Sequence, residues 1–150
     1  MRAAFQGLSV GSGPSSILFV CRHNAIRSPM AAALARQASP NTYIRSAGLE
    51  TGQADPFAVA VMAEKGLDIS KRKPRSLEEL NDTSFDLVVT LAPEAHHHVL
   101  DLARTQSFDV VYWPTLDPSG AQGSREQILE SYRSVRDALD HQVNELFAQT

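Results

Sequence analysis

The sequence contains a single cysteine, Cys21, among its 150 residues. One cysteine cannot form an internal disulfide, so a disulfide-stabilised scaffold is excluded. It cannot supply a multi-cysteine metal site either, and the adjacent histidines at 96–98 would point about 100° apart on a helix. We therefore expect no metal and no cofactor. A lone free thiol is compatible with a reducing compartment.

Long apolar segments are also missing. No run approaches the ~20 apolar residues that a transmembrane helix needs. Residues 1–16 lack the apolar stretch of a signal peptide. The sequence thus predicts a cytoplasmic protein with no membrane partner.

A strong excess of positive charge is absent as well. Lys and Arg number 14 against 17 Asp and Glu, which gives a formal net charge of −3. This balance argues against a nucleic-acid partner, although it allows one local basic site. With 150 residues, the chain has the size of about one domain.

Apolar runs and turn signals divide the chain. Residues 1–16 end in Gly, Pro and Ser, which predicts a flexible N-terminal extension. We interpret residues 17–150 as a single domain, with strands expected at 17–20, 42–45, 85–91 and 108–113.

Helix-start signals separate these strands. Ser28-Pro29 predicts an N-cap followed by proline in the first turn. Asp55-Pro56 predicts a second helix, which Gly66 ends. A further helix is expected at 93–104. A capping box at 76–79 predicts a short helix, and another at 124–127 predicts the start of a long C-terminal helix.

The alternation of strands and helices predicts an α/β fold. We expect a four-stranded parallel sheet with helices on both faces, a flavodoxin-like or Rossmann-like three-layer sandwich. In such folds ligands bind beyond the carboxyl ends of the strands. The first strand leads into Cys21, so the chemistry is expected there.

The loop from Cys21 to Arg27 lies between this strand and the Ser28-Pro29 helix start. Backbone N–H groups of such a loop can converge on one anion. Arg27 offers a planar fork for two oxygens of a tetrahedral oxyanion. The helix dipole and Arg27 favour the thiolate form of Cys21. The pattern predicts a nucleophile beneath a bound phosphate, while an inert buried thiol is the alternative.

Asp117 follows the fourth predicted strand and precedes Pro118. It lies at the edge of the sheet that should carry the loop. Burial beside a bound anion would bring the pKa of this carboxyl toward that of a working general acid. The alternative is an ordinary turn aspartate.

In combination, these motifs resemble the low-molecular-weight protein tyrosine phosphatase family, which is related to phosphatase-like arsenate reductases. The resemblance covers about residues 17–148. It rests on 17–20, the Cys-x5-Arg-Ser loop 21–28, Pro29-Met30-Ala31, Ser46-Ala47-Gly48, 66–77, 85–89 and Asp117-Pro118.

The resemblance implies hydrolysis of phosphate monoesters, above all phosphotyrosine on proteins, through a phosphocysteine intermediate. Cys21 would be the nucleophile, Arg27 would bind the phosphoryl oxygens and Asp117 would be the general acid. Ser46 would support the loop, as would Arg72, which replaces a frequent histidine of the family. Substrate-binding positions would be Arg22, His23, Asn24, Ala25, Ile26 and Ser28, the last also bonded to the thiolate.

The sequence departs from the family at several positions. His23 replaces a usual glycine, so it must project outward or alter the loop. Ile26 stands where some members have a second cysteine, so a protective internal disulfide is impossible. Leu49-Glu50 and Ser119-Gly120 occupy the regions of aromatic walls, which weakens stacking on a tyrosine ring.

Two aromatic residues and a basic run have open roles. Tyr112 and Trp113 either replace the missing aromatic walls or pack in the core. The cations either rim the site or form a solvated run, namely Lys71, Arg72, Lys73 and Arg75.

Two other functions remain open. Arsenate mimics phosphate, and the absence of further cysteines restricts arsenate reduction to a mechanism that uses an external small thiol. The chain could also bind phospho-ligands without catalysis. We expect a phosphorylated protein and phosphate or another oxyanion as partners, and a monomer or weak dimer.

Overall fold

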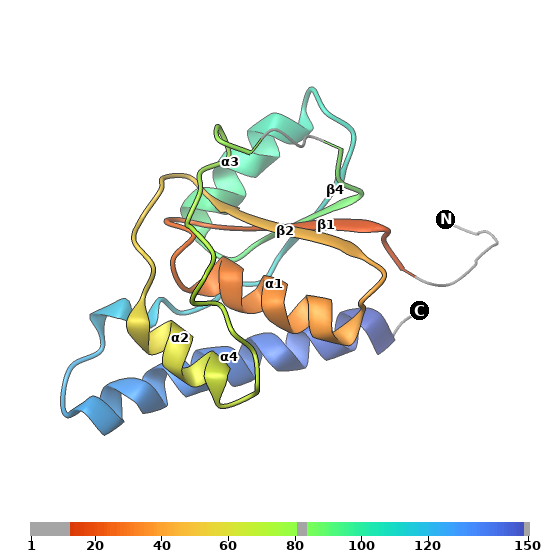
Figure 1. The fold of residues 1–150 in the computed structure, drawn as a ribbon. Helices are drawn as coiled ribbons and strands as arrows, with labels where there is room; N and C mark the ends of the chain where they lie inside the picture. The colour runs from red at the N-terminus through yellow and green to blue at the C-terminus, as the bar shows by residue number, and fades with distance from the viewer. Residues whose placement is uncertain (1–12, 81–83, 149–150) are drawn as a thin grey trace.

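Four parallel strands form one sheet in the order β2-β1-β3-β4 (Figure 1). The strands are β1 (Ser16–Cys21), β2 (Tyr43–Gly48), β3 (Leu87–Thr90) and β4 (Asp109–Tyr112). The computed structural model describes residues 13–80 and 84–148, and the statements below concern these residues. The predicted four-stranded parallel sheet is confirmed.

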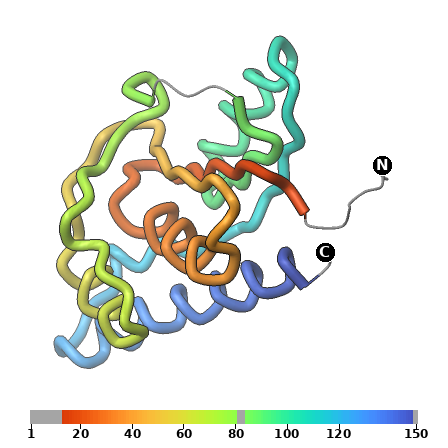
Figure 2. Tube along the Cα trace, turned by 45° about the vertical axis from the view of Figure 1, so that its right-hand side comes forward, coloured from red at the N-terminus to blue at the C-terminus, as the bar shows by residue number. Residues whose placement is uncertain are grey.

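Helices cover both faces of the sheet, as predicted. On one face lie α1 (Arg27–Ala38) and α4 (Arg125–Ala148), with α2 (Pro56–Ala63) packed against α4 (Figure 1). On the other face lies α3 (Pro93–Ala103), and the 3₁₀ helix η1 (Pro118–Gly120) precedes α4. The tube view shows the 66–80 segment running past α1 to β2 (Figure 2).

Alternating side chains of β1 divide between two cores. Ile17 and Phe19 face the core under α1 and α4, whereas Leu18 and Val20 face the core under α3. This is the two-residue period of a strand that is buried on both faces. The C-terminal helix α4 buries one apolar stripe, at Leu129, Tyr132, Val135, Leu139 and Val143.

Two predicted local features are wrong. Ser28 does not cap α1: the helix begins at Arg27, Ile26 holds the N-cap position, and no side chain bonds there. The Ser76 Oγ and Glu79 carboxylate do exchange the bonds of a capping box, but the chain forms only a turn there. Leu80 already lies outside the turn, so the reciprocal bonds do not extend into a helix there.

The N-terminal extension falls mostly outside the described residues, which begin at Gly13. The backbone N–H of Ser15 donates to Asp86 Oδ2 at 2.9 Å, and Ser15 O accepts from Tyr43 N at 3.0 Å. Ser16 begins β1. The sheet therefore holds the last residues of this segment.

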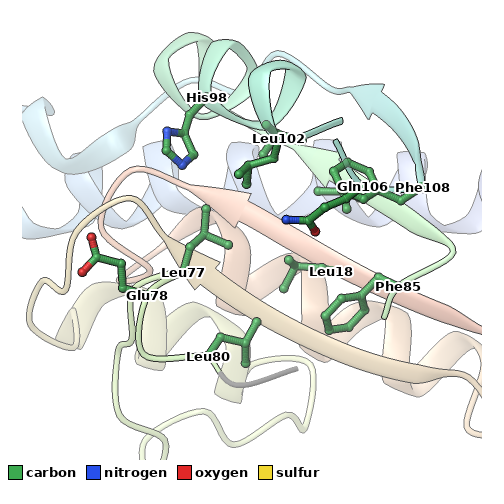
Figure 3. Close-up of a pocket in the computed structure, with 11 residues that line it drawn as sticks. Leu18, Leu77, Glu78, Leu80, Phe85, His98, Leu102, Gln106 and Phe108 are labelled. Atoms are coloured by element: carbon green, nitrogen blue, oxygen red, sulfur yellow. The ribbon is translucent and has the colours of Figure 1, made fainter. Parts of the chain in front are cut away.

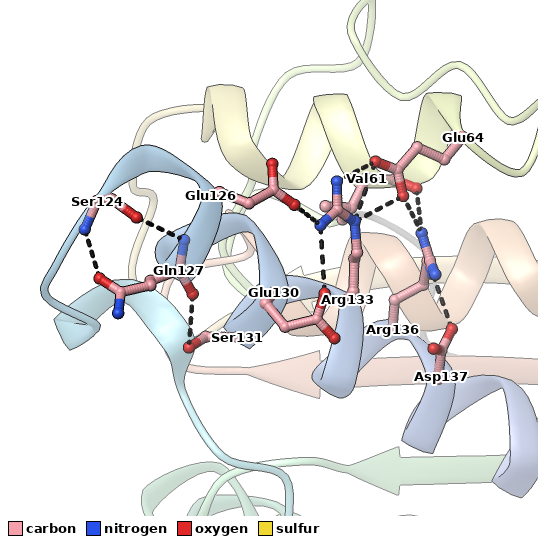
Figure 4. A network of polar contacts seen from close by, with 10 residues as sticks. All are labelled: Val61, Glu64, Ser124, Glu126, Gln127, Glu130, Ser131, Arg133, Arg136 and Asp137. Atoms are coloured by element: carbon pink, nitrogen blue, oxygen red, sulfur yellow. Dashed lines mark hydrogen bonds and ion pairs between the residues drawn. The ribbon is translucent and has the colours of Figure 1, made fainter.

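A charged network fastens α2 to α4 (Figure 4). Arg133 and Arg136 each donate to the Glu64 carboxylate at 2.8 Å, and Arg136 also donates to Val61 O at 2.8 Å. The hydrogen bonds from Arg133 and Arg136 lower the pKa of Glu64 to about 2. The network fixes α2, and the N-cap residue of this helix, Asp55, reaches the site described next.

No helix in the described ranges is long and apolar enough to cross a membrane.

Candidate active site

The loop of residues 21–27 joins β1 to α1 at the carboxyl end of the sheet. Here β2 and β3 lie on opposite sides of β1, so the strand order reverses, which is where open α/β sheets bind ligands. A cavity of about 240 Å³ opens at this point. It is lined by Cys21, His23, Ala25, Ile26, Arg27, Gly52, Gln53, Asp55, Asp117 and Ser119.

Cys21 lies at the floor of this cavity, and its Sγ is 3.0 Å from Ser28 Oγ. Ser28 Oγ accepts from Asn24 Nδ2 at 2.8 Å, so its own proton points to Cys21 Sγ or to Ala47 O at 3.3 Å. A thiolate is the nearer acceptor and it is charged, so it makes the stronger hydrogen bond. The Ser28 hydroxyl is therefore placed to donate to Cys21 Sγ.

Asn24 determines the shape of the loop. It is fully buried, and its φ of 56° is the one left-handed value among the described residues other than glycine. Asparagine tolerates this conformation better than most residues. Its Nδ2 also donates to Ser46 Oγ at 3.0 Å, and its Oδ1 accepts from Arg75 N at 2.9 Å. Ser46 therefore lies where the predicted loop support would act.

Arg72 lies beneath the same loop. Its guanidinium donates to Asn24 O at 3.1 Å and to Asn24 Oδ1. Burial and the neighbouring charge of Arg75 lower the pKa of Arg72 to about 10, so it remains a cation at neutral pH. Arg75, which the sequence did not single out as a support, contributes its backbone N–H.

Arg27 and Asp117 face each other across the cavity. Arg27 Nη1 donates to Thr115 O at 3.0 Å, and Nη2 is 3.8 Å from Asp117 Oδ2. Burial by itself acts to raise the pKa of Asp117. The hydrogen bonds from Ser119 and the charges of Arg27 and His23 outweigh burial and hold the pKa below its usual value. A bound dianion would raise this pKa, because it brings negative charge beside the carboxylate.

Arg22 and His23 project away from the loop's buried side. Arg22 pairs with Glu50 at 2.9 Å and Glu94 at 3.3 Å, and it does not line the cavity. His23 is exposed and lines the cavity with an ordinary negative φ, so the loop does not need glycine there. Gly52 leaves the room that His23 requires, since a Cβ at 52 would lie 2.8 Å from His23 Cβ.

A family model described as "Low molecular weight phosphotyrosine protein phosphatase" matches residues 16–150. The chain belongs to this family. The resemblance drawn from the loop and its flanking motifs is confirmed.

Relatives in this family carry different names. The chain is 31% identical over 134 residues to "Glutaredoxin arsenate reductase" of Synechocystis, covering 89% of this chain and 96% of that protein. It is 37% identical over 109 residues to "Probable low molecular weight protein-tyrosine-phosphatase EpsP" of Ralstonia solanacearum, covering 63% and 75%.

One solved structure in this group is a cysteine-to-serine mutant of the arginine phosphatase YwlE with a phosphorylated active-site serine, and YwlE is known from Bacillus subtilis. It is 27% identical to this chain, and the match covers 89% of this chain and 94% of the YwlE chain with a TM-score of 0.73.

Among the residues that the structure describes, no aromatic side chain forms a wall of the cavity. No Phe, Tyr or Trp of the described chain lines it. Trp113 is buried and packs on Phe19, with 5.9 Å between the ring centroids. Tyr112 stacks on His96, with 4.4 Å between the ring centroids. Trp113 therefore packs on β1 and Tyr112 packs on α3, and neither replaces a wall of the cavity.

The basic run does not line the cavity. Lys71 and Lys73 are exposed, whereas Arg72 is turned under the loop. Within the described ranges no group of three His, Cys, Asp or Glu residues could hold a metal ion.

Asp55 is a cavity residue that sequence reasoning treated only as a helix start. Its Oδ1 accepts from Phe57 N at 2.8 Å and caps α2, and its Oδ2 accepts from Tyr132 OH at 2.9 Å. Burial and the bond to Asp55 raise the pKa of Tyr132, so this phenol stays protonated. The Asp55-Pro56 pair predicted the helix cap, but it gave no indication that Asp55 lines the cavity.

Gly48 is needed because the loop's backbone passes very close to it. A Cβ at this position would lie 2.6 Å from Asn24 N, 2.7 Å from Glu50 O and 2.8 Å from Arg22 O. We expect Gly48→Ala to displace the loop, lower the Tm by several degrees and abolish measurable phosphate binding, because backbone atoms cannot give way cheaply. Thermal unfolding and calorimetric titration with phosphate measure both effects.

The matched control is Gly120→Ala, because a Cβ there meets nothing within 4 Å. Its stability should stay within about 0.5 kcal/mol of the wild type. Equal losses of stability and of phosphate binding in the two variants would contradict the role given to Gly48.

Proposed function

We propose that the protein hydrolyses phosphate monoesters through a covalent Cys21–phosphate intermediate. The proposal is carried by one observation: Cys21, Arg27 and Asp117 converge on one cavity at the carboxyl end of β1. A nucleophile, a bidentate oxyanion ligand and a proton donor are the parts that this reaction needs.

In the first step Cys21 Sγ attacks phosphorus. The S–P bond forms and the P–O bond to the leaving group breaks. Arg27 and the loop N–H groups balance the charge of the phosphoryl oxygens. Protonated Asp117 gives its proton to the leaving oxygen, so an alcohol or phenol departs rather than its anion.

In the second step water attacks the phosphocysteine. The Asp117 carboxylate takes one proton from the water, the new P–O bond forms and the S–P bond breaks. Phosphate leaves, and Cys21 returns to the thiolate beside Ser28. The phosphorylated active-site serine of the arginine phosphatase YwlE supports a covalent step at the nucleophile's position.

Phosphotyrosine on proteins is the proposed substrate, supported by the family description and by the relative EpsP. The lack of aromatic walls favours broad acceptance of aryl phosphates over tight recognition of one ring. We assign the catalysis to residues 17–150 as one domain and place it in the cytoplasm.

Arsenate reduction with an external thiol is the second candidate. It is favoured by relatives named arsenate reductase that match 89% of this chain, and by a cavity whose walls suit an inorganic oxyanion. Cys21 sulfur would attack arsenic, the S–As bond would form and one As–O bond would break with its oxygen leaving as water. An external thiol would then attack the Cys21 sulfur. Arsenite would leave with the electron pair as a mixed disulfide forms, and a second thiol would restore Cys21.

A substrate panel with the full chain separates these functions. We expect turnover of 4-nitrophenyl phosphate and of a phosphotyrosine peptide at rates of the order of 1 s⁻¹ or more, because the acid and the nucleophile are both in place. Arsenite formation from arsenate, glutathione and glutaredoxin is measured alongside and should be at least about tenfold slower.

Faster arsenite formation would transfer the assignment to the reductase. Calorimetric phosphate binding without turnover of any ester would show a binding module and would contradict both enzymatic candidates. The panel also includes phosphoarginine, which has a P–N bond in place of an ester bond. If phosphoarginine is hydrolysed faster than the phosphotyrosine peptide, the preference for phosphotyrosine is overturned.

A further inference from the structure

A second cavity, of about 230 Å³, lies on the face of the sheet that α3 covers (Figure 3). Leu18 and Val88 of the sheet form its floor, and Val99 and Leu102 of α3 lie across from them. The 77–80 turn closes another side with Leu77 and Leu80. The cavity is therefore built from three separate elements, and its walls are mostly apolar.

Three polar side chains stand around this apolar space, namely Glu78, His98 and Gln106. Figure 3 shows His98 and Gln106 pointing toward the space between α3 and the turn. Within the described residues, none of the three side chains has a hydrogen-bond or ion-pair partner. An apolar pocket with a few convergent polar groups is the usual form of a small-molecule site.

The size and lining define the class of ligand. A volume of about 230 Å³ lies below the ~300–1,000 Å³ of sites for drug-sized molecules, so one fused pair of rings is the natural occupant. Phe85 and Phe108 in the lining suit a flat ring. The imidazole of His98 and the amide of Gln106 offer both donors and acceptors to the ring's edge.

We propose that this cavity binds a small planar heteroaromatic molecule, with its ring nitrogens paired to His98 and Gln106. The ring packs between the leucines of the sheet, the turn and α3. This site is separate from the Cys21 cavity, with which it shares no lining residue.

One segment connects the two cavities. Arg72 and the backbone of Arg75 hold Asn24 in the catalytic loop, residues 21–27. Farther along the same segment, residues 77, 78 and 80 line the second cavity. Between them, Gly48 N donates to Arg75 O at 2.9 Å, and Leu77 N donates to Gly48 O at 2.9 Å. A ligand packed on Leu77 therefore holds this segment where it supports the loop.

The consequence is a coupling between the two sites. A ligand in the second cavity should tighten phosphate binding at Cys21, and phosphate should tighten the ligand by the same factor. We expect about fivefold, the lower end of usual couplings. This step rests on the proposed function only in assuming that the catalytic loop binds phosphate.

The test is calorimetric titration of the full chain with benzimidazole, which carries a donor and an acceptor on a fused ring. We expect a saturable site with a Kd below about 1 mM. Indene has the same shape without the nitrogens, and it should bind about fivefold more weakly for want of a net hydrogen bond. Leu102→Trp fills the cavity and should remove benzimidazole binding.

Leu100→Trp is the matched control, because Leu100 lies on the same helix, is exposed and does not line the cavity. It should bind benzimidazole like the wild type. Gln106→Leu changes an exposed residue and should lower benzimidazole affinity to a value between those of wild-type benzimidazole and indene binding, because His98 remains. Hydrolysis of 4-nitrophenyl phosphate should be the same in all three variants.

Absence of saturable binding up to about 10 mM, or equal binding by Leu102→Trp, would overturn the site. Unchanged phosphate affinity at saturating benzimidazole would overturn the coupling. Benzimidazole binding in a protein without turnover would leave the site standing and would reject only the proposed function. The two failures are thus distinguishable.

Discussion

Replacing Cys21 by serine should reduce kcat for an aryl phosphate by about 10⁴–10⁶-fold, the loss typical of removing a nucleophile. A serine hydroxyl is not ionised at neutral pH, so the variant lacks the thiolate nucleophile of the proposed mechanism. The sulfur that it replaces lies 3.0 Å from Ser28 Oγ. Phosphate binding should persist, because Arg27 and the loop N–H groups remain. Steady-state kinetics and phosphate calorimetry on the same preparation measure both results.

The single cysteine supplies an internal control for this variant. Iodoacetamide should add one group to the wild type and none to Cys21→Ser, as mass spectrometry counts directly. Phosphate should slow the alkylation, because it occupies the cavity above Cys21. Residual kcat within tenfold of the wild type would refute nucleophilic catalysis by Cys21.

Asp117→Asn should lower kcat by about 10²–10⁴-fold, the usual contribution of a general acid. The pKa of Asp117 lies below its usual value, and a bound dianion raises it. The wild-type kcat should therefore fall as pH rises above the pKa that Asp117 has in the complex. This limb should be missing from the pH profile of the variant.

Leaving-group basicity distinguishes lost acid catalysis from a general defect. The penalty of Asp117→Asn should grow as the leaving phenol becomes more basic, because a basic phenolate needs the proton most. Phosphate itself should bind more tightly to the variant, since a negative charge 3.8 Å from Arg27 has been removed. An equal penalty for all phenols would argue against Asp117 as the acid.

The strands and most helices were predictable because their signals are local. Four apolar runs, the Asp55-Pro56 start and the Ser124–Gln127 capping box all appear in the structure. Ser28-Pro29 was misread for an instructive reason. A serine before proline is a good N-cap in isolation, but here the Ser28 hydroxyl bonds Cys21, Asn24 and Ala47 instead.

The support of the loop was only partly predictable. Ser46 and Arg72 followed from a resemblance, whereas Arg75 acts through its backbone N–H, which no side-chain pattern reveals. Asp55 was visible as a cap but not as a wall of the cavity. These contacts join residues more than twenty positions apart, so they depend on how the segments pack and not on neighbouring residues.

The linear chain carried the chemistry: one cysteine, an arginine six positions later, a strand before them and a helix after them. Those features are local, because a strand-loop-helix unit forms its anion site from consecutive residues. Tertiary packing decided which distant groups meet that unit. It brought Asp117 to Arg27 and brought Arg72 and Arg75 to Asn24, and it left a second cavity under α3. Such meetings depend on the sheet order and on side-chain volumes, which no single stretch of sequence encodes.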